Sequence, residues 1–438
     1  MIRNLSLGAL CILPFFTINA KAVQFAPAVT NTPPYSPWRL AVADINKDNK
    51  LDLLVLGKYS GASAFVTIYL GTGDGSFNLH TNYGILGDPY DLAVKDLNQD
   101  GNLDLIVAYN TNYCLSFGQS DGSFAAQTCY LVDGQPVDIT IADYDSDGIE
   151  DLICPGSTMS VRTGLGNGLF GSKTNYHVAG GDSRLVAFHD FDGDGLMDVI
   201  RSMDAPSASS ILRINKGSEP GVYTNHMELA VSFRPERFSV ADFNNNGHLD
   251  VLLVASSQPL LLVTNDGHAN FSVALSNTLA RSYLLSQPAI ADFDGDGLID
   301  LALTYYNGSQ SADVFINLGG SFSSPVTNAI GDLAGAIVSG DFDGDGRPDL
   351  ITASYSPPRI YYLRNLSKPT LQIHYNGGQV RVIWPNWNAF DLYTTESLAP
   401  PINWELRTIG ITTVEETKQL SLEPTAPQVF LKLMEQAN

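Results

Sequence analysis

Aspartate residues recur at a fixed spacing in this chain, as in the segment Asp292-Phe-Asp-Gly-Asp-Gly-Leu-Ile-Asp300. Its carboxylates occupy positions 1, 3, 5 and 9, and Gly297 occupies position 6. A hard cation such as calcium takes about six to eight oxygen ligands, which acids on alternate residues of a tight turn can supply. Position 6 needs a sharp turn, which glycine adopts readily because it tolerates positive φ. The segment therefore predicts a calcium-binding loop.

Seven loops of this type occur, and we number them loop 1 to loop 7. They begin at Asp44, Asp96, Asp143, Asp190, Asp242, Asp292 and Asp341. They follow the pattern Asp-x-[Asp/Asn]-x-[Asp/Asn]-[Gly/Asn]-x-x-Asp, and successive loops start 47 to 52 residues apart. A fixed period in this range is typical of propeller blades.

We predict side-chain ligands at positions 1, 3, 5 and 9. Position 7 carries unrelated side chains, which favours its backbone carbonyl as a ligand. In loops 1 to 3 the predicted ligands are Asp44, Asn46, Asp48, Lys50, Asp52, Asp96, Asn98, Asp100, Asn102, Asp104, Asp143, Asp145, Asp147, Ile149 and Asp151. In loops 4 and 5 they are Asp190, Asp192, Asp194, Leu196, Asp198, Asp242, Asn244, Asn246, His248 and Asp250. In loops 6 and 7 they are Asp292, Asp294, Asp296, Leu298, Asp300, Asp341, Asp343, Asp345, Arg347 and Asp349. We expect up to seven Ca²⁺ ions, with a structural role.

Other interpretations of the loops are weaker. EF-hand and dockerin loops need an acid at position 12, where this chain has strand residues such as Val55 and Leu303. Hard oxygen ligands disfavour zinc, whereas magnesium and metal-free Asx-rich turns remain open. Loops 3, 4, 6 and 7 each offer four aspartates. Loop 5 offers only Asp242 and Asp250, so we expect it to bind most weakly and to empty first on chelation.

The residues around each loop predict strands. Short apolar runs precede and follow every loop, a third run comes next, and a Gly-rich turn leads to a fourth run that opens on an aromatic residue. Helical periodicity is absent, so four strands per repeat predict an all-β, seven-bladed β-propeller. After loop 7 the chain leaves the repeat without a fourth strand. The segment around Phe25 is therefore expected to supply the outer strand of the last blade.

These units resemble FG-GAP (VCBS-type) repeats, the building blocks of integrin α-subunit propellers and of many secreted bacterial proteins. The residues that carry the resemblance are those from Ala291 to Leu301, their six counterparts, and the Gly-Ser-Phe turns between them. The resemblance covers roughly residues 23–366. It implies a calcium-stapled propeller, and it leaves the ligand open because such repeats serve differing functions.

Two segments flank the predicted propeller. Residues 1–22 have the basic, apolar and Ala-x-Ala regions of a secretory signal peptide, so we expect a secreted or cell-surface protein. Residues 370–438 show short alternating strands and predict a small β-sandwich, which resembles immunoglobulin-like or fibronectin III-like modules of exported bacterial proteins. Cys114 and Cys129 flank an apparent hairpin and could form a cross-strand disulfide or remain as buried thiols.

Charge and motifs bear on the function. The formal net charge of -22 disfavours nucleic acid, and no segment after residue 22 predicts membrane insertion. More than half of the acids lie in the seven loops, so the acidity is mainly metal-site chemistry. No GxSxG or HExxH motif occurs, and the seven histidines are scattered. We therefore favour a monomeric adhesion or recognition protein, with a polysaccharide lyase or hydrolase as the alternative.

Strand order places the loops on one face of the disc and the more variable connections on the other. Recognition residues concentrate on variable loops of rigid scaffolds. We therefore expect a protein or carbohydrate ligand on the face opposite the metal loops. Candidate residues there are Tyr35, Trp38, Tyr90, Arg184, Arg234, Arg237 and Arg281.

Overall fold

The computed structural model describes most of the chain. The described residues are 3–5, 23–58, 63–109, 112–131, 139–154, 159–176, 183–204, 209–278, 287–305, 310–332, 334–369, 372–376, 379–387, 390–395, 405–407, 411–414, 417–422 and 429–435. Across these residues, the secondary structure consists of strands, and no helix is long and apolar enough to cross a membrane.

The described strands of residues 23–366 form seven four-stranded antiparallel sheets, which we call blades 1 to 7. Blade 1 contains β3 (Ser36–Ala43), β4 (Asp52–Lys58), β5 (Ser63–Gly71) and β6 (Phe77–Leu86). Blade 2 contains β7 (Pro89–Lys95), β8 (Asp104–Tyr109), β9 (Asn112–Ser116) and β10 (Thr128–Leu131). Blade 3 contains β11 (Thr140–Ala142), β12 (Asp151–Cys154), β13 (Met159–Gly164) and β14 (Phe170–Tyr176). Blade 4 contains β15 (Ser183–His189), β16 (Asp198–Asp204), β17 (Ser210–Glu219) and β18 (Val222–Val231).

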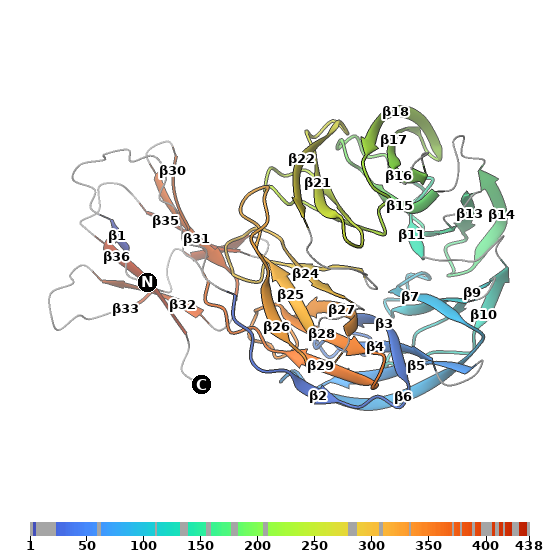
Figure 1. The fold of residues 1–438 in the computed structure, drawn as a ribbon, viewed down its shortest axis with the longest axis horizontal. Coiled ribbons are helices and arrows are strands. Elements are labelled where there is room, and N and C mark those ends of the chain that lie inside the picture. Colours follow the sequence, from blue (N-terminus) through green and yellow to red (C-terminus); the bar gives the residue numbers. More distant parts are fainter. Residues whose placement is uncertain are drawn as a thin grey trace.

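The remaining blades continue the same order. Blade 5 contains β19 (Arg237–Ala241), β20 (Asp250–Val254), β21 (Pro259–Asn265) and β22 (Phe271–Thr278). Blade 6 contains β23 (Ala289–Ala291), β24 (Asp300–Thr304), β25 (Ser311–Phe315) and β26 (Val326–Ala329). Blade 7 contains β27 (Ala334–Gly340), β28 (Asp349–Ser354), β29 (Arg359–Leu363) and, out of chain order, β2 (Val29–Asn31). Figure 1 shows the blades as successive sectors of a ring, which confirms the predicted all-β propeller fold.

The second strand of each blade carries the core. In β8, β20, β24 and β28 every residue is buried, on both faces of the sheet. Their Leu-, Ile- and Val-rich runs suit this position because a strand packed between two neighbouring blades has no solvent face. The continuous apolar runs in the sequence therefore arise from blade-on-blade packing.

The N-terminal segment closes the ring, as predicted. In blade 7, Val29 of β2 pairs with Tyr362 of β29, and Phe25 forms a bridge with Asn365. The Phe25 ring packs edge-on against Phe293 of blade 6, with their centroids 6.0 Å apart. Residues 32–35 then lead from β2 of blade 7 into β3 of blade 1, so the chain itself also joins these two blades.

Aromatic pairs join successive blades around the ring. In four blades, the aromatic residue after the turn that follows the third strand packs on an aromatic residue at position 2 of the Asp-rich loop in the preceding blade. The pairs, with their centroid distances, are Tyr223–Tyr144 (5.1 Å), Phe271–Phe191 (5.3 Å), Phe322–Phe243 (6.1 Å) and Phe77–Phe342 (5.7 Å). Tyr223–Tyr144 is tilted and the other three pairs are edge-to-face, an arrangement that adds about 0.5–1.5 kcal/mol beyond the area that it buries.

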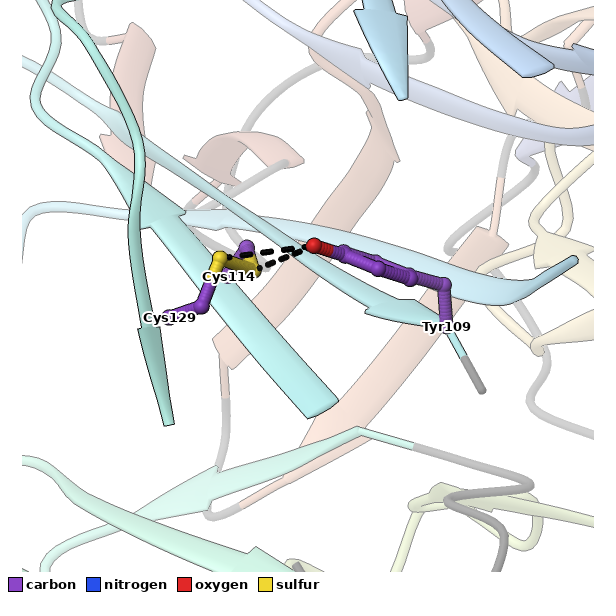
Figure 2. The surroundings of a disulfide bond; sticks show 3 residues. All are labelled: Tyr109, Cys114 and Cys129. Atoms are coloured by element: carbon purple, nitrogen blue, oxygen red, sulfur yellow. Dashed lines mark hydrogen bonds between the residues drawn. A yellow bond between two sulfur atoms is a disulfide. The ribbon is translucent and has the colours of Figure 1, made fainter. Parts of the chain in front are cut away.

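Cys114 and Cys129 form a disulfide, which answers the question that the sequence left open. They are directly paired residues of β9 and β10, with their Cα atoms 4.1 Å apart. The Tyr109 hydroxyl lies 3.0 Å from the sulfur of Cys114 and 3.4 Å from that of Cys129 (Figure 2). The bond ties the outermost strand of blade 2 to the rest of its sheet.

The C-terminal residues form two further four-stranded sheets beside the ring (Figure 1). One contains β30 (Gln372–Asn376), β31 (Gln379–Pro385), β35 (Thr417–Leu422) and β34 (Ile411–Val414). The other contains β1 (Arg3–Leu5), β36 (Val429–Glu435), β32 (Phe390–Thr395) and β33 (Glu405–Leu406). Trp384 of the first sheet and Leu431 of the second share one core, as expected for a sandwich. Because β1 comes from the predicted signal peptide, cleavage there would leave β36 at the edge of its sheet.

Candidate metal centres

All seven predicted loops connect the first and second strands of a blade and share one backbone conformation. Position 6 has φ between +83° and +87° in the six loops with glycine there, and +63° in loop 1, where Asn49 occupies it. Position 4 is left-handed as well, for example at Lys47 (φ 61°) and Gly295 (φ 70°). The sequence pattern indicated the first turn and missed the second, because only three loops have glycine at position 4.

The carboxylate at position 1 organises each loop. In loop 3, Oδ1 of Asp143 accepts the backbone N–H of Asp147 at 3.0 Å, and Oδ2 accepts that of Gly148 at 2.8 Å. Asp147 in turn accepts the N–H of Ile149 at 2.8 Å. These N–H groups thus hold the carboxylates in place. The N–H of position 7 is used in this way, so its carbonyl is the backbone group that could bind a cation.

Three carboxylates converge in four of the described loops. Their ligand atoms lie within 4.8 Å of one another in the sets Asp143, Asp145 and Asp151; Asp190, Asp192 and Asp194; Asp292, Asp294 and Asp296; and Asp341, Asp343 and Asp349. These are the four loops predicted to bind most strongly. Loops 1, 2 and 5 bring fewer acids together, since Asn46, Asn98 and Asn244 stand at their third positions.

The donor set fits a hard cation. In loop 3, Oδ1 of Asp145 is buried and accepts no hydrogen bond. In loop 5, Oδ1 of Asn244 is likewise buried and accepts none. A buried acceptor without a partner costs about 1–3 kcal/mol, and a divalent cation would satisfy it. The loop residues offer oxygen ligands, which calcium prefers, and these residues would hold the ion.

Burial and mutual repulsion act on the acids of loop 6. Burial, with the neighbouring carboxylate of Asp296, raises the pKa of Asp292 to about 7. Burial, with the charges of Asp294 and Asp292, raises the pKa of Asp300 to about 9. These carboxylates are therefore costly to ionise without a positive charge beside them, and a bound cation would supply one.

In loops 4 and 7, basic side chains of the protein contact the carboxylates. Lys216 pairs with Asp192, and although burial opposes the change, this ammonium lowers the pKa of Asp192. In loop 7, Arg347 and Arg364 both contact Asp345, the second at 3.1 Å, and Arg364 also pairs with Asp343. The acid count alone ranks these loops as strong sites, but their internal cations compete with a metal ion.

The aspartate at position 9 has a second, structural role. Each of the seven is at most 1 % exposed. In loop 6, Oδ2 of Asp300 accepts the N–H of Phe293 at 2.8 Å, and Oδ1 accepts that of Asn317 at 2.8 Å. The same two bonds recur in the other loops, with a glycine in place of Asn317 in blades 1 to 4. Position 9 therefore ties the loop to the end of the third strand, whether or not it also binds a metal.

Position 2 offers its carbonyl to the next blade, a contact that sequence reasoning missed. The side-chain amides of Asn265, Asn317 and Asn365 donate to the carbonyls of Phe191, Phe243 and Phe293, at 2.7, 2.6 and 2.9 Å. The Tyr223 hydroxyl donates to Tyr144 at 2.7 Å, and the Gly75 N–H donates to Phe342 at 2.9 Å. The metal loops are thus also joints between blades.

The predicted recognition residues are placed in part. Tyr35 stacks on Phe65, with centroids 4.0 Å apart, and Trp38 meets the exposed Tyr355 edge-on at 6.4 Å. Tyr90 and Arg237 are half-buried and Arg234 is exposed. The side chain of Arg184 and all of Arg281 lie outside the described residues, as do most of the variable connections.

Comparison with known proteins agrees with this geometry. A ring of four-stranded blades with an Asp-rich loop between the first two strands of each blade defines a β-propeller with acidic loops. A family model described as FG-GAP-like repeat matches residues 96–154, 242–303 and 292–352, and one described as FG-GAP repeat matches residues 334–382. Residues 96–154 and 242–382 of the chain therefore contain FG-GAP repeats.

Solved structures share the fold at low identity. One is an Agrocybe aegerita lectin described as specifically recognising non-reducing terminal N-acetylglucosamine. It is 16% identical, with a TM-score of 0.53, over 76% of this chain and 87% of the lectin. Another is BBS1N in complex with ARL6DN, 12% identical with a TM-score of 0.52, over 79% of this chain and 98% of that one. No curated protein matches the sequence.

Proposed function

We propose that this chain is an exported, calcium-binding β-propeller that recognises a protein or carbohydrate ligand, with calcium as a structural element. The observation that carries the metal part is the convergence of three carboxylates in each of four loops, with an unpartnered buried acceptor on Asp145. Seven loops of one conformation argue for a scaffold role, because a reaction would need only one of them.

For the ligand we propose the face opposite the loops, where blades 7 and 1 meet. Tyr355 is 40 % exposed, and its ring lies beside Trp38, which also has the ammonium of Lys58 5.0 Å from its centroid. Arg359, with Asp332 at 3.2 Å, follows Tyr355 in the same turn. Aromatic rings flanked by charged donors and acceptors suit sugar rings and their hydroxyls.

Metal dependence is tested by thermal unfolding. Stripping the protein of divalent cations should lower Tm, and adding Ca²⁺ should restore it more fully than Mg²⁺, because converging carboxylates repel one another without a cation. A Tm that is the same in stripped and calcium-loaded protein would contradict a structural metal.

Ligand recognition is tested on immobilised glycans, starting with N-acetylglucosamine-terminated ones because the lectin neighbour recognises that sugar. We expect retention without turnover, and a loss of binding of roughly tenfold or more in Tyr355→Ala, which removes about 1.4 kcal/mol or more of contact. Leu165→Ala, an exposed substitution on blade 3, is the control. Release of new reducing ends would instead indicate an enzyme, and retention that is equal in both variants would move the site elsewhere.

A further inference from the structure

The C-terminal module lies directly on loop 6. A Cβ atom at Gly295 would be 2.6 Å from Cη2 of Trp387, 2.9 Å from Cα of Pro369 and 3.0 Å from Cγ of Pro385. The equivalent position of loop 4, Gly193, has no atom within 4 Å of such a Cβ. Glycine at position 4 of loop 6 therefore leaves room for the module as well as permitting the left-handed turn.

This contact changes the environment of the loop 6 carboxylates. Asp294 is 4 % exposed, and the position-3 residues of the other six loops are half-buried as whole residues. The side chains of Asp192 and Asp343 are also covered, at 6 % and 5 % exposed, but by the cations of Lys216 and Arg364, whereas loop 6 is covered by the apolar residues of the module. Three carboxylates of loop 6 converge within 4.8 Å beneath the module. Excluding water strengthens electrostatic interactions of both signs, so a covered acidic loop repels more strongly when empty and attracts a cation more strongly when loaded.

Loop 7 also contacts the C-terminal module and the linker before it, through the side chain of Arg347. The Arg347 side chain is 3 % exposed and its Nε donates to Asp345 at 2.9 Å. Its Nη1 donates to the carbonyl of Ser367 in the linker at 3.4 Å, and its guanidinium carbon lies 5.7 Å from the centroid of the Phe390 ring in the module. The protein thus neutralises carboxylate charge in loop 7 with a side chain that also holds the module.

We propose that loop 6 and the C-terminal module form a cation-responsive latch, in which Trp387, Pro385 and Pro369 close over the loop and make module docking depend on a cation held by Asp292, Asp294 and Asp296. The inference rests on the proposed calcium binding. Linkage is reciprocal, so docking must also raise the affinity of loop 6 for the cation. Loop 7 keeps the module attached through Arg347, so that loss of the cation loosens the joint on one side.

The test uses the full chain, loaded with Ca²⁺ or stripped of it, and compares matched substitutions at position 3. Small-angle scattering gives the radius of gyration, and limited proteolysis of residues 366–438 reports docking. We expect stripping, or Asp294→Asn in the presence of Ca²⁺, to increase both the radius and the rate of cleavage severalfold. Asp192→Asn, the same change in loop 4, where nothing lies within 4 Å of a Cβ at Gly193, should leave both unchanged.

Tb³⁺ provides a second readout, because indole next to a bound lanthanide sensitises its emission. Trp387→Phe should lose most of the indole-excited Tb³⁺ emission and weaken Tb³⁺ binding at one site, whereas Trp38→Phe, on the opposite face, should do neither. Isothermal titration separates the two hypotheses. If calcium binds but the radius of gyration and the cleavage rate do not change with it, the latch is overturned and the proposed cation binding stands. Absence of any calcium binding overturns both.

Discussion

The left-handed backbone at position 6 of the metal loops limits which residues the loops accept. Gly195 has φ +87° and no atom within 4 Å of a built Cβ, so a substitution there meets backbone strain without a steric clash. We expect Gly195→Ala to lower the free energy of unfolding by about 1–2 kcal/mol, measured by urea denaturation with Ca²⁺ present.

Lys47, which has φ 61° at position 4 of loop 1, provides the matched control. Lys47→Gly removes strain of the same kind, which stabilises the folded state. Glycine also gives the unfolded chain more conformational freedom, which opposes this gain, so the net effect on stability should be neutral or stabilising. Equal destabilisation by both substitutions would contradict this account.

The raised pKa values in loops 6 and 7 predict how the stripped protein responds to pH. Burial raises the pKa of Asp292 to about 7, that of Asp349 to about 8 and that of Asp300 to about 9. Because the folded state holds these protons more tightly than the unfolded state, the stability that they contribute is present below about pH 4 and is lost as pH rises toward 7 to 9.

The measurement is the free energy of unfolding between pH 5 and pH 8, in metal-free buffer and in Ca²⁺. The stripped protein should lose stability across this window, and Ca²⁺ should flatten or reverse the trend by favouring the ionised carboxylates. A stripped protein that becomes more stable toward pH 8 would rule out the proposed environment of these acids.

At the scale of the element, the joint between blades depends on one buried amide. Asn317 is fully buried, and its side chain donates to the carbonyls of Phe243 at 2.6 Å and Ile299 at 3.0 Å. Asn317→Ala leaves both acceptors without this donor and should cost about 1–3 kcal/mol. Asn328→Ala, whose half-buried amide makes only bonds of 3.3 and 3.4 Å within its own blade, should cost much less. Urea denaturation of the two variants compares them directly.

Much of the repeat could be predicted from the sequence, because each blade repeats the same physical requirement. The aspartates at position 1 and the apolar second strands recur at every repeat, and glycine occupies position 6 in six of the seven, so their period exposes them. The donors to the position-2 carbonyl recur by type only in blades 5 to 7, as the amides of Asn265, Asn317 and Asn365. Tyr223 provides a hydroxyl in blade 4 and Gly75 a backbone N–H in blade 1, so the contact has no pattern that repeats around the whole ring.

At the scale of the molecule, contacts between distant segments were the least predictable. The N-terminal closure could be inferred because Phe25 stands at the repeat's own spacing from Asp44. The contact between Gly295 and Trp387 could not, since glycine at position 4 also occurs in loops 4 and 7 and Trp387 belongs to a segment without the repeat. The pairs that Arg364 makes with the acids of loop 7 were missed for a similar reason, because Arg364 lies outside that loop.

The way the ring closes also determines how the protein responds to tension. Phe25 and Asn365 are bridged to each other, and from them β2 and β29 run antiparallel through Val29–Tyr362 to Asn31–Ile360. A pull on the two ends of the propeller therefore loads this pair of strands at one end and separates it one residue pair at a time. In single-molecule force spectroscopy with handles at residues 23 and 366, we expect the first rupture at low force, with a short extension set by residues 23–35. The other blades should remain intact at that force, so the ring would open at its seam before its core is strained.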